Sequence, residues 1–303
     1  MNEAIDIRDK PCLSEEDVLA LNFIHDSGRY RFRRHFRAGL RSHIMEVLDP
    51  EDVALEKRGV LLDGLHRYPR ARPLKMLRIF RTRFKDLGEA QEELERVKII
   101  EAYLSPLCHA KSEEFLVDYQ FGGRYHIVLC GLQEYVAGVV LDPWSRLDAD
   151  YLLSLHGSLC SNSDNPPSLS AAAWLQRLKS RTSRFVDNVK QMIVEAQHVP
   201  DLAGLSNLLV TPEADVKLVD INNISTVSFT AEISVDDRGY PVCDKSIQAL
   251  YRLEKRLLER SALEKESIYR VFMGASRIER VRAVERKFHL AMRETVAAEG
   301  CFS

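Results

Sequence analysis

Three oxygen-bearing side chains between residues 201 and 220 have types and spacings that suit chemistry. Asp201 lies in a loop that contains proline and glycine, Asn207 opens a short apolar run, and Asp220 closes the next one. The two runs flank turn residues 212–215, a pattern that predicts a β-hairpin holding Asn207 near Asp220, with Asp201 on the adjacent loop. An amide and a carboxylate oxygen suit Mg²⁺, which prefers hard oxygen ligands and leaves positions for phosphate and water.

Asp201 would then be free to accept a proton or to orient a nucleophile beside the metal. A base, a metal and a bound phosphate suit phosphoryl transfer, in which catalysis consists mainly of positioning and charge neutralisation. Asp201 is therefore the candidate catalytic residue, and Asn207 and Asp220 are the candidate metal ligands.

Apolar periodicity predicts the elements that must position these residues. In the first part of the chain, alternation predicts strands over residues 28–36, 42–48 and 74–80. Residues 49–73 contain several glycines and prolines, and we interpret them as a loop with one short helix. Spacings of three and four between apolar residues predict a helix over Asp86–Leu104.

The rest of the chain becomes mainly helical. A hairpin or two neighbouring strands are predicted over residues 115–129 around two adjacent glycines, followed by an extended segment to residue 136. Helices are predicted over residues 148–159, 170–197 and 244–297, with a loop over 161–167. Strands followed by helices indicate an α+β protein.

Composition bounds the class of protein. The 303 residues carry a formal net charge of -2, which gives no global attraction to nucleic acid or anionic lipid. The six cysteines form no C-x-x-C pair, which argues against a zinc ribbon or a redox site of that type. No apolar run reaches the length of a membrane span, and the first residues lack the apolar core of a secretory signal. We therefore expect a cytoplasmic protein.

With these residues in place, the chain from about Arg29 to Asn223 resembles the protein kinase-like superfamily. That group includes protein kinases, aminoglycoside and choline phosphotransferases, and sugar kinases of the lipopolysaccharide core. The resemblance implies ATP and Mg²⁺ as cofactors and a two-lobed kinase-like fold. It implies a small lobe of antiparallel sheet and one helix over residues 26–136, and a mainly helical lobe over 137–303. Before these lobes we expect a helical extension over residues 1–25, because Ser14 and the acids after it are typical of a helix N-terminus.

The resemblance also implies roles for single residues in the larger lobe. Asp201 would be the base of a catalytic loop over residues 198–207, and Asn207 the first metal ligand. Asp220 would be the counterpart of the aspartate of the family's DFG motif, within a metal-binding hairpin over 207–223.

In the smaller lobe the resemblance implies nucleotide contacts. Gly39 falls in the position of the phosphate-covering glycine loop, Arg78 in that of the ATP-binding lysine, and Glu93 in that of its partner acid. Glu134 and Val136 belong to the expected hinge, which contacts adenine through its backbone.

Three departures from the family pattern leave an alternative open. Arg78 stands where a lysine is usual, and Lys75, three residues earlier, faces the opposite side of a straight strand. Asp201 and Asn207 are one residue further apart than in protein kinases. The glycine loop has a single glycine. A pseudokinase that senses nucleotide or binds proteins is the alternative to an active phosphotransferase.

Simpler interpretations compete with each assignment. Asp201, near Pro200 and Gly204, could be an ordinary turn residue, and Asp220 could be a turn residue at a strand end. The arginine-rich segment 29–41 could bind nucleic-acid phosphates, but we favour a solvated strand face balanced by acids, and expect no nucleic-acid partner. The acceptor, a small molecule or a protein side chain, is not identified by the sequence.

Overall fold

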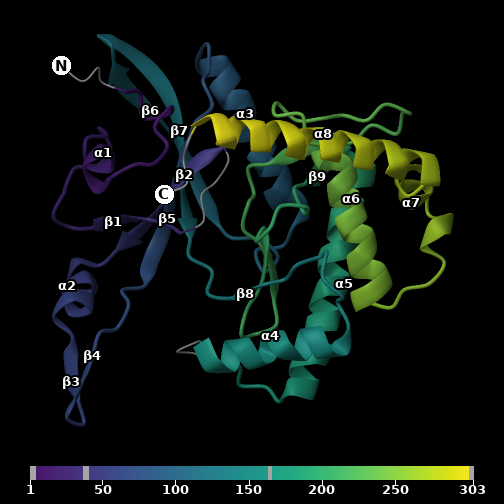
Figure 1. Ribbon diagram of the computed structural model, residues 1–303, viewed down its shortest axis with the longest axis horizontal. Helices are drawn as coiled ribbons and strands as arrows, with labels where there is room; N and C mark the ends of the chain where they lie inside the picture. The colour runs from purple at the N-terminus through teal and green to yellow at the C-terminus, as the bar shows by residue number, and fades with distance from the viewer. Residues whose placement is uncertain (1–4, 37–40, 163–165, 300–303) are drawn as a thin grey trace. The chain divides into compact units, whose positions relative to one another are not determined.

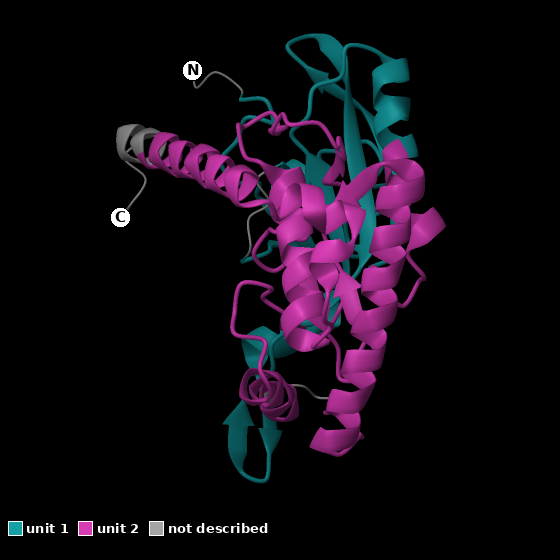
Figure 2. Cartoon of the chain, turned by 90° about the vertical axis from the view of Figure 1, so that its right-hand side faces the viewer, with its two compact units in different colours: residues 1–95, 110–135 teal, residues 96–109, 136–303 magenta. Residues whose placement is uncertain are grey.

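The structure, a computed structural model, describes residues 5–36, 41–162 and 166–299. The chain divides into two compact units: unit 1 comprises residues 1–95 and 110–135, and unit 2 comprises residues 96–109 and 136–303 (Figure 2). Both units contain helices and strands, so the predicted α+β class is confirmed. Within the described ranges, no helix is long and apolar enough to cross a membrane.

Unit 1 is built on an antiparallel sheet with β5 at its centre. The five strands described in this sheet lie in the order β1-β2-β5-β7-β6 (Figure 1). The turn between β6 and β7 uses Gly122 and Gly123, whose positive φ angles would strain a residue with a Cβ atom. The strands are β1 (Arg31–Arg34), β2 (Ser42–Leu48), β5 (Pro73–Phe80), β6 (Ser112–Phe121) and β7 (Arg124–Glu134).

The N-terminal segment belongs to the core of unit 1. Ser14 caps helix α1 (Glu15–Leu19) in a reciprocal capping box with Asp17, which satisfies the first backbone donors of the helix. Apolar residues of this segment then pack in one buried cluster with residues of the sheet. They are Ile7, Leu13, Val18 and Leu21. The helix expected in the N-terminal extension over residues 1–25 is present as α1, and apolar side chains of this segment form part of the core of unit 1.

An insertion between β2 and β5 contains a hairpin that the sequence interpretation missed. Helix α2 (Pro50–Arg58) is the short helix expected there, but β3 (Val60–Leu62) and β4 (Leu65–Arg67) pair directly after it. Asp63 and Gly64 form the turn with positive φ angles, the geometry of a two-residue hairpin loop. The interpretation of residues 49–73 as loop with one helix was wrong because it treated Gly64 as a breaker rather than as a turn.

The boundary between the units falls within helix α3 (Leu87–Tyr103). Val97, Ile100 and Leu104, the periodic apolar residues of this segment, belong to the buried cluster of unit 2. Residues 96–109 therefore belong to unit 2, whereas the sequence analysis placed them in the smaller lobe.

Unit 2 is organised around the long helix α5 (Ala171–Ala196). One face of α5 is fully buried from Trp174 to Ile193, as the helical periodicity predicted. The same cluster includes residues from both helices and strands of unit 2. The other helices are α4 (Ala149–Asn162), α6 (Val242–Arg252), α7 (Ser267–Phe272) and α8 (Ala275–Glu299), with a π-helical turn η1 (Leu253–Leu257) and a 3₁₀ turn η2 (Leu263–Lys265).

Two small antiparallel sheets of unit 2 frame the segment from residue 198 to residue 226. Strand β10 (Leu208–Val210) lies between β11 (Val216–Leu218) and β8 (Val139–Val140), so the hairpin expected after Asn207 is present. Strand β9 (His198–Pro200) pairs with β12 (Ile224–Thr226). Gly138 lies so close to β10 that a Cβ atom there would be 2.7 Å from the carbonyl oxygen of Val210.

Candidate functional site

Asp201 is fixed in a loop by hydrogen bonds to both of its carboxylate oxygens. Its Oδ1 accepts from the backbone N–H groups of Ala203 (2.9 Å) and Gly204 (3.0 Å). Its Oδ2 accepts from the Asn223 side-chain amide at 2.8 Å. The residue is only 8% exposed. Asp201 is therefore more than a surface turn residue, since its carboxylate is buried and oriented by three donors.

Strand pairing explains why Asp201 and Asn223 meet across 22 positions of sequence. Pro200 lies opposite Ile224 in the β9–β12 ladder, and the backbone N–H of Asp201 donates to the carbonyl of Asn223 at 2.8 Å. The ladder thus ends where the two side chains must face each other.

Asn207 is attached to the same loop by its amide nitrogen. Its Nδ2 donates to the backbone carbonyl of Asp201 at 2.9 Å, an arrangement that leaves Oδ1 as an acceptor or a metal ligand. Gly204 makes room for this contact, because a Cβ atom there would be 2.4 Å from Nδ2 of Asn207. The glycine in the loop is therefore required by close approach of the Asn207 side chain.

Asp220 is brought to the same end of the β10–β11 hairpin. Leu208 lies opposite Leu218, and beyond that pair the N–H of Val219 donates to the carbonyl of Asn207 at 2.9 Å. Asp220 follows directly and is half-buried. The structure thus gathers the three candidate residues of unit 2 at the adjoining ends of two small sheets.

The electrostatics of Asp201 differ from those of a surface carboxylate. Burial raises its pKa to about 6, and the neighbouring charge of Asp220 acts in the same direction. The hydrogen bonds from Gly204, Ala203 and Asn223 oppose that shift because they stabilise the ionised form. A carboxylate with a pKa near neutrality is suited to exchange a proton with a bound hydroxyl.

The donor set available for a metal is small. Among the described residues, no group of three or more His, Cys, Asp or Glu side chains lies close enough to hold an ion. One amide oxygen and one carboxylate match a magnesium ion that takes its remaining ligands from phosphate and water. The residues therefore fit a metal that arrives with a nucleotide better than a resident structural ion.

In unit 1, Arg78 lies on the central strand and is buried. It pairs in register with Ile44 of β2 and Gly131 of β7, is 6% exposed, and its guanidinium carbon is 5.3 Å from the centre of the Phe80 ring. Lys75 of the same strand is exposed. Arg78 is thus the buried cation of β5, in keeping with the choice made from the sequence.

The remaining candidates of the smaller lobe are placed unequally. Glu93 is half-buried, whereas the other glutamates of this helical turn, Glu92 and Glu95, are exposed. Glu134 ends β7 in unit 1, and Val136 follows as the first residues of unit 2 begin. Gly39 lies outside the described residues. The nucleotide contacts assigned to these residues stay predictions.

Sequence reasoning missed the residues whose side chains form hydrogen bonds with the backbone of the Asp201 loop. The indole N–H of Trp144 donates to the carbonyl of Ala203 at 3.2 Å, and the Lys245 ammonium lies 4.1 Å from the centre of the indole ring. The hydroxyl of Ser246 accepts from the backbone N–H of Leu202 at 3.1 Å. Each contact joins residues more than 40 positions apart, and no local pattern announces it.

The arginine-rich segment is partly neutralised by acids. Arg31 forms an ion pair with Glu15 at 2.6 Å, and Arg33 pairs with Glu46 at 2.7 Å and Glu56 at 2.8 Å. These contacts support the simpler interpretation, a strand face balanced by carboxylates.

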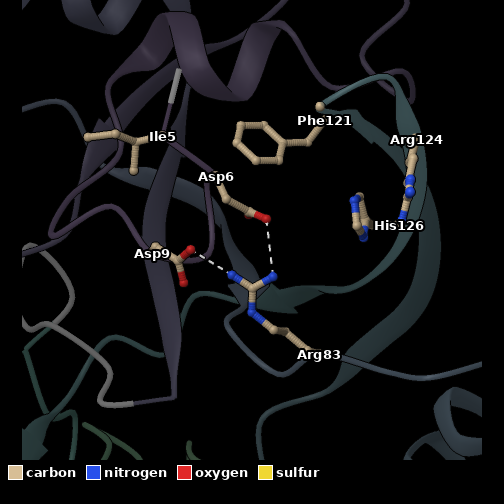
Figure 3. Close-up of a pocket in the computed structure, with 8 residues that line it drawn as sticks. Ile5, Asp6, Asp9, Arg83, Phe121, Arg124 and His126 are labelled. Carbon is tan, nitrogen blue, oxygen red and sulfur yellow. Dashed lines mark hydrogen bonds and ion pairs between the residues drawn. The ribbon is translucent and has the colours of Figure 1, made fainter. Parts of the chain in front are cut away.

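A pocket of about 490 Å³ in unit 1 contains none of the predicted residues. Figure 3 shows Arg83 between Asp6 and Asp9, to which it donates at 3.4 and 2.6 Å. Two carboxylates of the protein therefore already pair with the Arg83 cation.

Comparison with known proteins assigns no family. No protein-family model matches the chain, and no curated protein matches it in sequence.

The raised pKa predicts how stability depends on pH. The pKa of Asp201 is higher in the folded than in the unfolded protein, so folding favours the protonated carboxyl. The stability that this carboxyl contributes is complete below the unfolded pKa of 3.8 and is lost as pH rises through the folded pKa of about 6. Asp201→Asn, which stays neutral, should therefore gain stability relative to the wild type across that window. The expected gain is about 3 kcal/mol, at about 1.4 kcal/mol per pKa unit.

Urea denaturation at a series of pH values measures this gain. Asp118→Asn, at an exposed position of β6, is the matched control and should show no such trend. A stability difference between Asp201→Asn and the wild type that stays constant from acid to neutral pH would contradict the burial of an ionisable carboxyl.

Proposed function

We propose that the protein is an ATP- and Mg²⁺-dependent phosphotransferase of the two-lobed kinase-like type, which transfers a γ-phosphoryl group to a hydroxyl acceptor. The observation that carries the proposal is the double anchoring of the loop: Asn207 Nδ2 donates to the Asp201 carbonyl while Asn223 and two backbone amides orient the Asp201 carboxylate. Because ATP is the donor in this proposal, we place the protein in the cytoplasm.

The order of elements along the chain supports the proposal. Two strands, β1 and β2, are followed, after the insertion of α2 and the β3–β4 hairpin, by the central strand β5, helix α3 and the β6–β7 hairpin. The chain then enters unit 2, where the loop with Asp201 and the hairpin that ends at Asp220 follow in that order. This is the order that the resemblance to kinase-like proteins requires.

In the proposed reaction, Asp201 orients the acceptor hydroxyl and takes its proton. The acceptor oxygen forms a bond to the γ-phosphorus as the bond from that phosphorus to the β,γ-bridging oxygen breaks, and ADP leaves. With a pKa of about 6, Asp201 is largely ionised at neutral pH and able to accept the proton. Asn207 Oδ1 and Asp220 would hold Mg²⁺, which supplies charge neutralisation for the phosphates.

A pseudokinase is the second candidate, and Arg78 is the observation that favours it. The buried cation of β5 is an arginine, which is bulkier than lysine and forked. A protein that binds nucleotide through Arg78 without turnover would act through conformational change or partner binding.

Turnover and nucleotide binding separate the two candidates. We expect ATP with Mg²⁺ to raise the melting temperature and expect slow ATP hydrolysis, with water as the stand-in acceptor. Asp201→Asn should keep the thermal shift and lose turnover by about 10² to 10⁴-fold, the usual contribution of general base catalysis. Asn207→Ala and Asp220→Ala should lose the Mg²⁺-dependent part of the shift.

Asp118→Asn is again the control and should behave as the wild type. A Mg²⁺-dependent shift without turnover in any assay would favour the pseudokinase. Absence of a shift at saturating ATP would contradict the phosphotransferase and a nucleotide-sensing pseudokinase, and would leave only a pseudokinase that acts by binding proteins.

Arg78 and Lys75 provide a matched pair on one strand. If Arg78 contacts the nucleotide phosphates, Arg78→Met should weaken Mg·ATP binding at least about tenfold, as loss of a charge-assisted hydrogen bond does. Lys75→Met, at an exposed position, should leave affinity unchanged. Isothermal titration measures both, and equal affinities for the two variants would remove Arg78 from the proposed site.

A further inference from the structure

The β3–β4 hairpin exposes large apolar side chains that nothing in the described chain covers. All residues from 61 to 70 are exposed. Leu61 is 63% exposed, Leu65 71% and Tyr68 65%. Both views show this hairpin projecting away from the sheet of unit 1 (Figures 1 and 2). Clustered leucines at a projecting tip are unusual on a water-facing surface, where large apolar patches mark interaction sites.

The hairpin is a stiff support for these side chains. Leu62 lies opposite Leu65 beside the turn, and Leu61 lies opposite His66 on the other face. Each strand has three residues, so the tip extends about 10 Å beyond the base at about 3.3 Å per residue. Leucines are thus presented on both faces of the tip.

Lys and Arg residues are concentrated in the hairpin and in the chain on either side of it. Residues 57–72 contain five Lys or Arg and one Asp, a formal charge of +4, while the whole chain carries -2. The side chains of Lys57, Arg58 and Arg67 form no hydrogen bond or ion pair with any described residue. Glu56, at the end of α2, is already occupied by Arg33 at 2.8 Å and by the backbone N–H of Ala71, and Arg70 pairs with Glu46 at 3.5 Å.

We propose that this hairpin docks the protein on an anionic lipid bilayer, with the leucines inserted between headgroups and the cations against lipid phosphates. The length of the hairpin suits the depth of about 5–10 Å at which peripheral apolar elements enter a bilayer. Cations beside a negative surface add attraction that salt weakens. The charge of +4 disfavours pairing of the hairpin with a second copy of itself. Leucines also lack the flat rings on which nucleic-acid bases stack.

Sedimentation with lipid vesicles tests the proposal without nucleotide, so its outcome does not depend on the proposed enzymatic activity. We expect the protein to bind vesicles of phosphatidylcholine mixed with phosphatidylglycerol, and to bind pure phosphatidylcholine at least tenfold more weakly. Lys57→Gln/Arg58→Gln/Arg67→Gln should lose affinity about fivefold for each cation removed. Leu61→Ser/Leu62→Ser/Leu65→Ser should lose most of the binding at both low and high salt.

Controls on helix α8 separate a local site from general charge. Arg282→Gln/Arg286→Gln/Lys287→Gln removes three exposed cations, and Leu290→Ser removes an exposed leucine, and both should bind as the wild type. Leu62→Trp should show a blue shift of its fluorescence with anionic vesicles, which reports insertion of the tip. Folding of each variant is checked by near-ultraviolet circular dichroism.

Several results would overturn the proposal. They are equal binding to both lipid mixtures, loss of binding in the α8 variants instead of the hairpin variants, or no vesicle binding by the wild type. Hairpin-dependent dimerisation or binding to an acidic polypeptide, with no vesicle binding, would assign the hairpin to a protein partner and also contradict it.

Discussion

The candidate site depends on the pairing of β9 with β12. That short ladder delivers Asp201 and Asn223 to one place, and from there a backbone bond and a side-chain bond tie the two residues together. Asn207 then closes the loop on the carbonyl of Asp201. Apolar neighbours of these polar residues, Leu202 and Ile221, are fully buried in the core of unit 2. The polar residues are thus fixed in position by their buried apolar neighbours in the chain as well as by the hydrogen bonds of the loop.

Burial of the Asp201 carboxylate has an electrostatic cost. Burial and the charge of Asp220 both disfavour an ionised Asp201, and three hydrogen bonds offset only part of that penalty. An uncharged side chain in this position would avoid the cost of desolvating a carboxylate, although it could not accept all three of these hydrogen bonds. A buried carboxyl group with a raised pKa is typical of functional sites.

The sequence predicted those strands, helices and hairpins whose formation depends on residues close to one another in the chain. Strand β2 was predicted with its bounds, α5 followed from its apolar face, and the β10–β11 hairpin followed from two apolar runs around a turn. Because that hairpin was foreseen, so was the proximity of Asn207 to Asp220.

Long-range pairing could not be predicted in the same way. The contact of Asn223 with Asp201 needs the β9–β12 ladder, and that of Trp144 with Ala203 spans 59 positions. Residues 96–109 belong to unit 2 because Val97 and Ile100 are buried in its core. The apolar periodicity of the helix predicts that these residues are buried, but it does not predict in which of the two cores. The net charge of the whole chain likewise concealed the cationic hairpin, because charge acts locally within about 10 Å at ordinary salt.

The central claim, that Asn207 and Asp220 hold a metal beside Asp201 when nucleotide is bound, is tested most directly by electron paramagnetic resonance of Mn²⁺ in place of Mg²⁺. In the presence of a non-hydrolysable ATP analogue, the wild type should bind Mn²⁺. The Mn²⁺ spectra of Asp220→Asn and of Asn207→Ala should differ from the spectrum of the wild type. Identical Mn²⁺ spectra and affinities for the wild type and both variants would contradict the account.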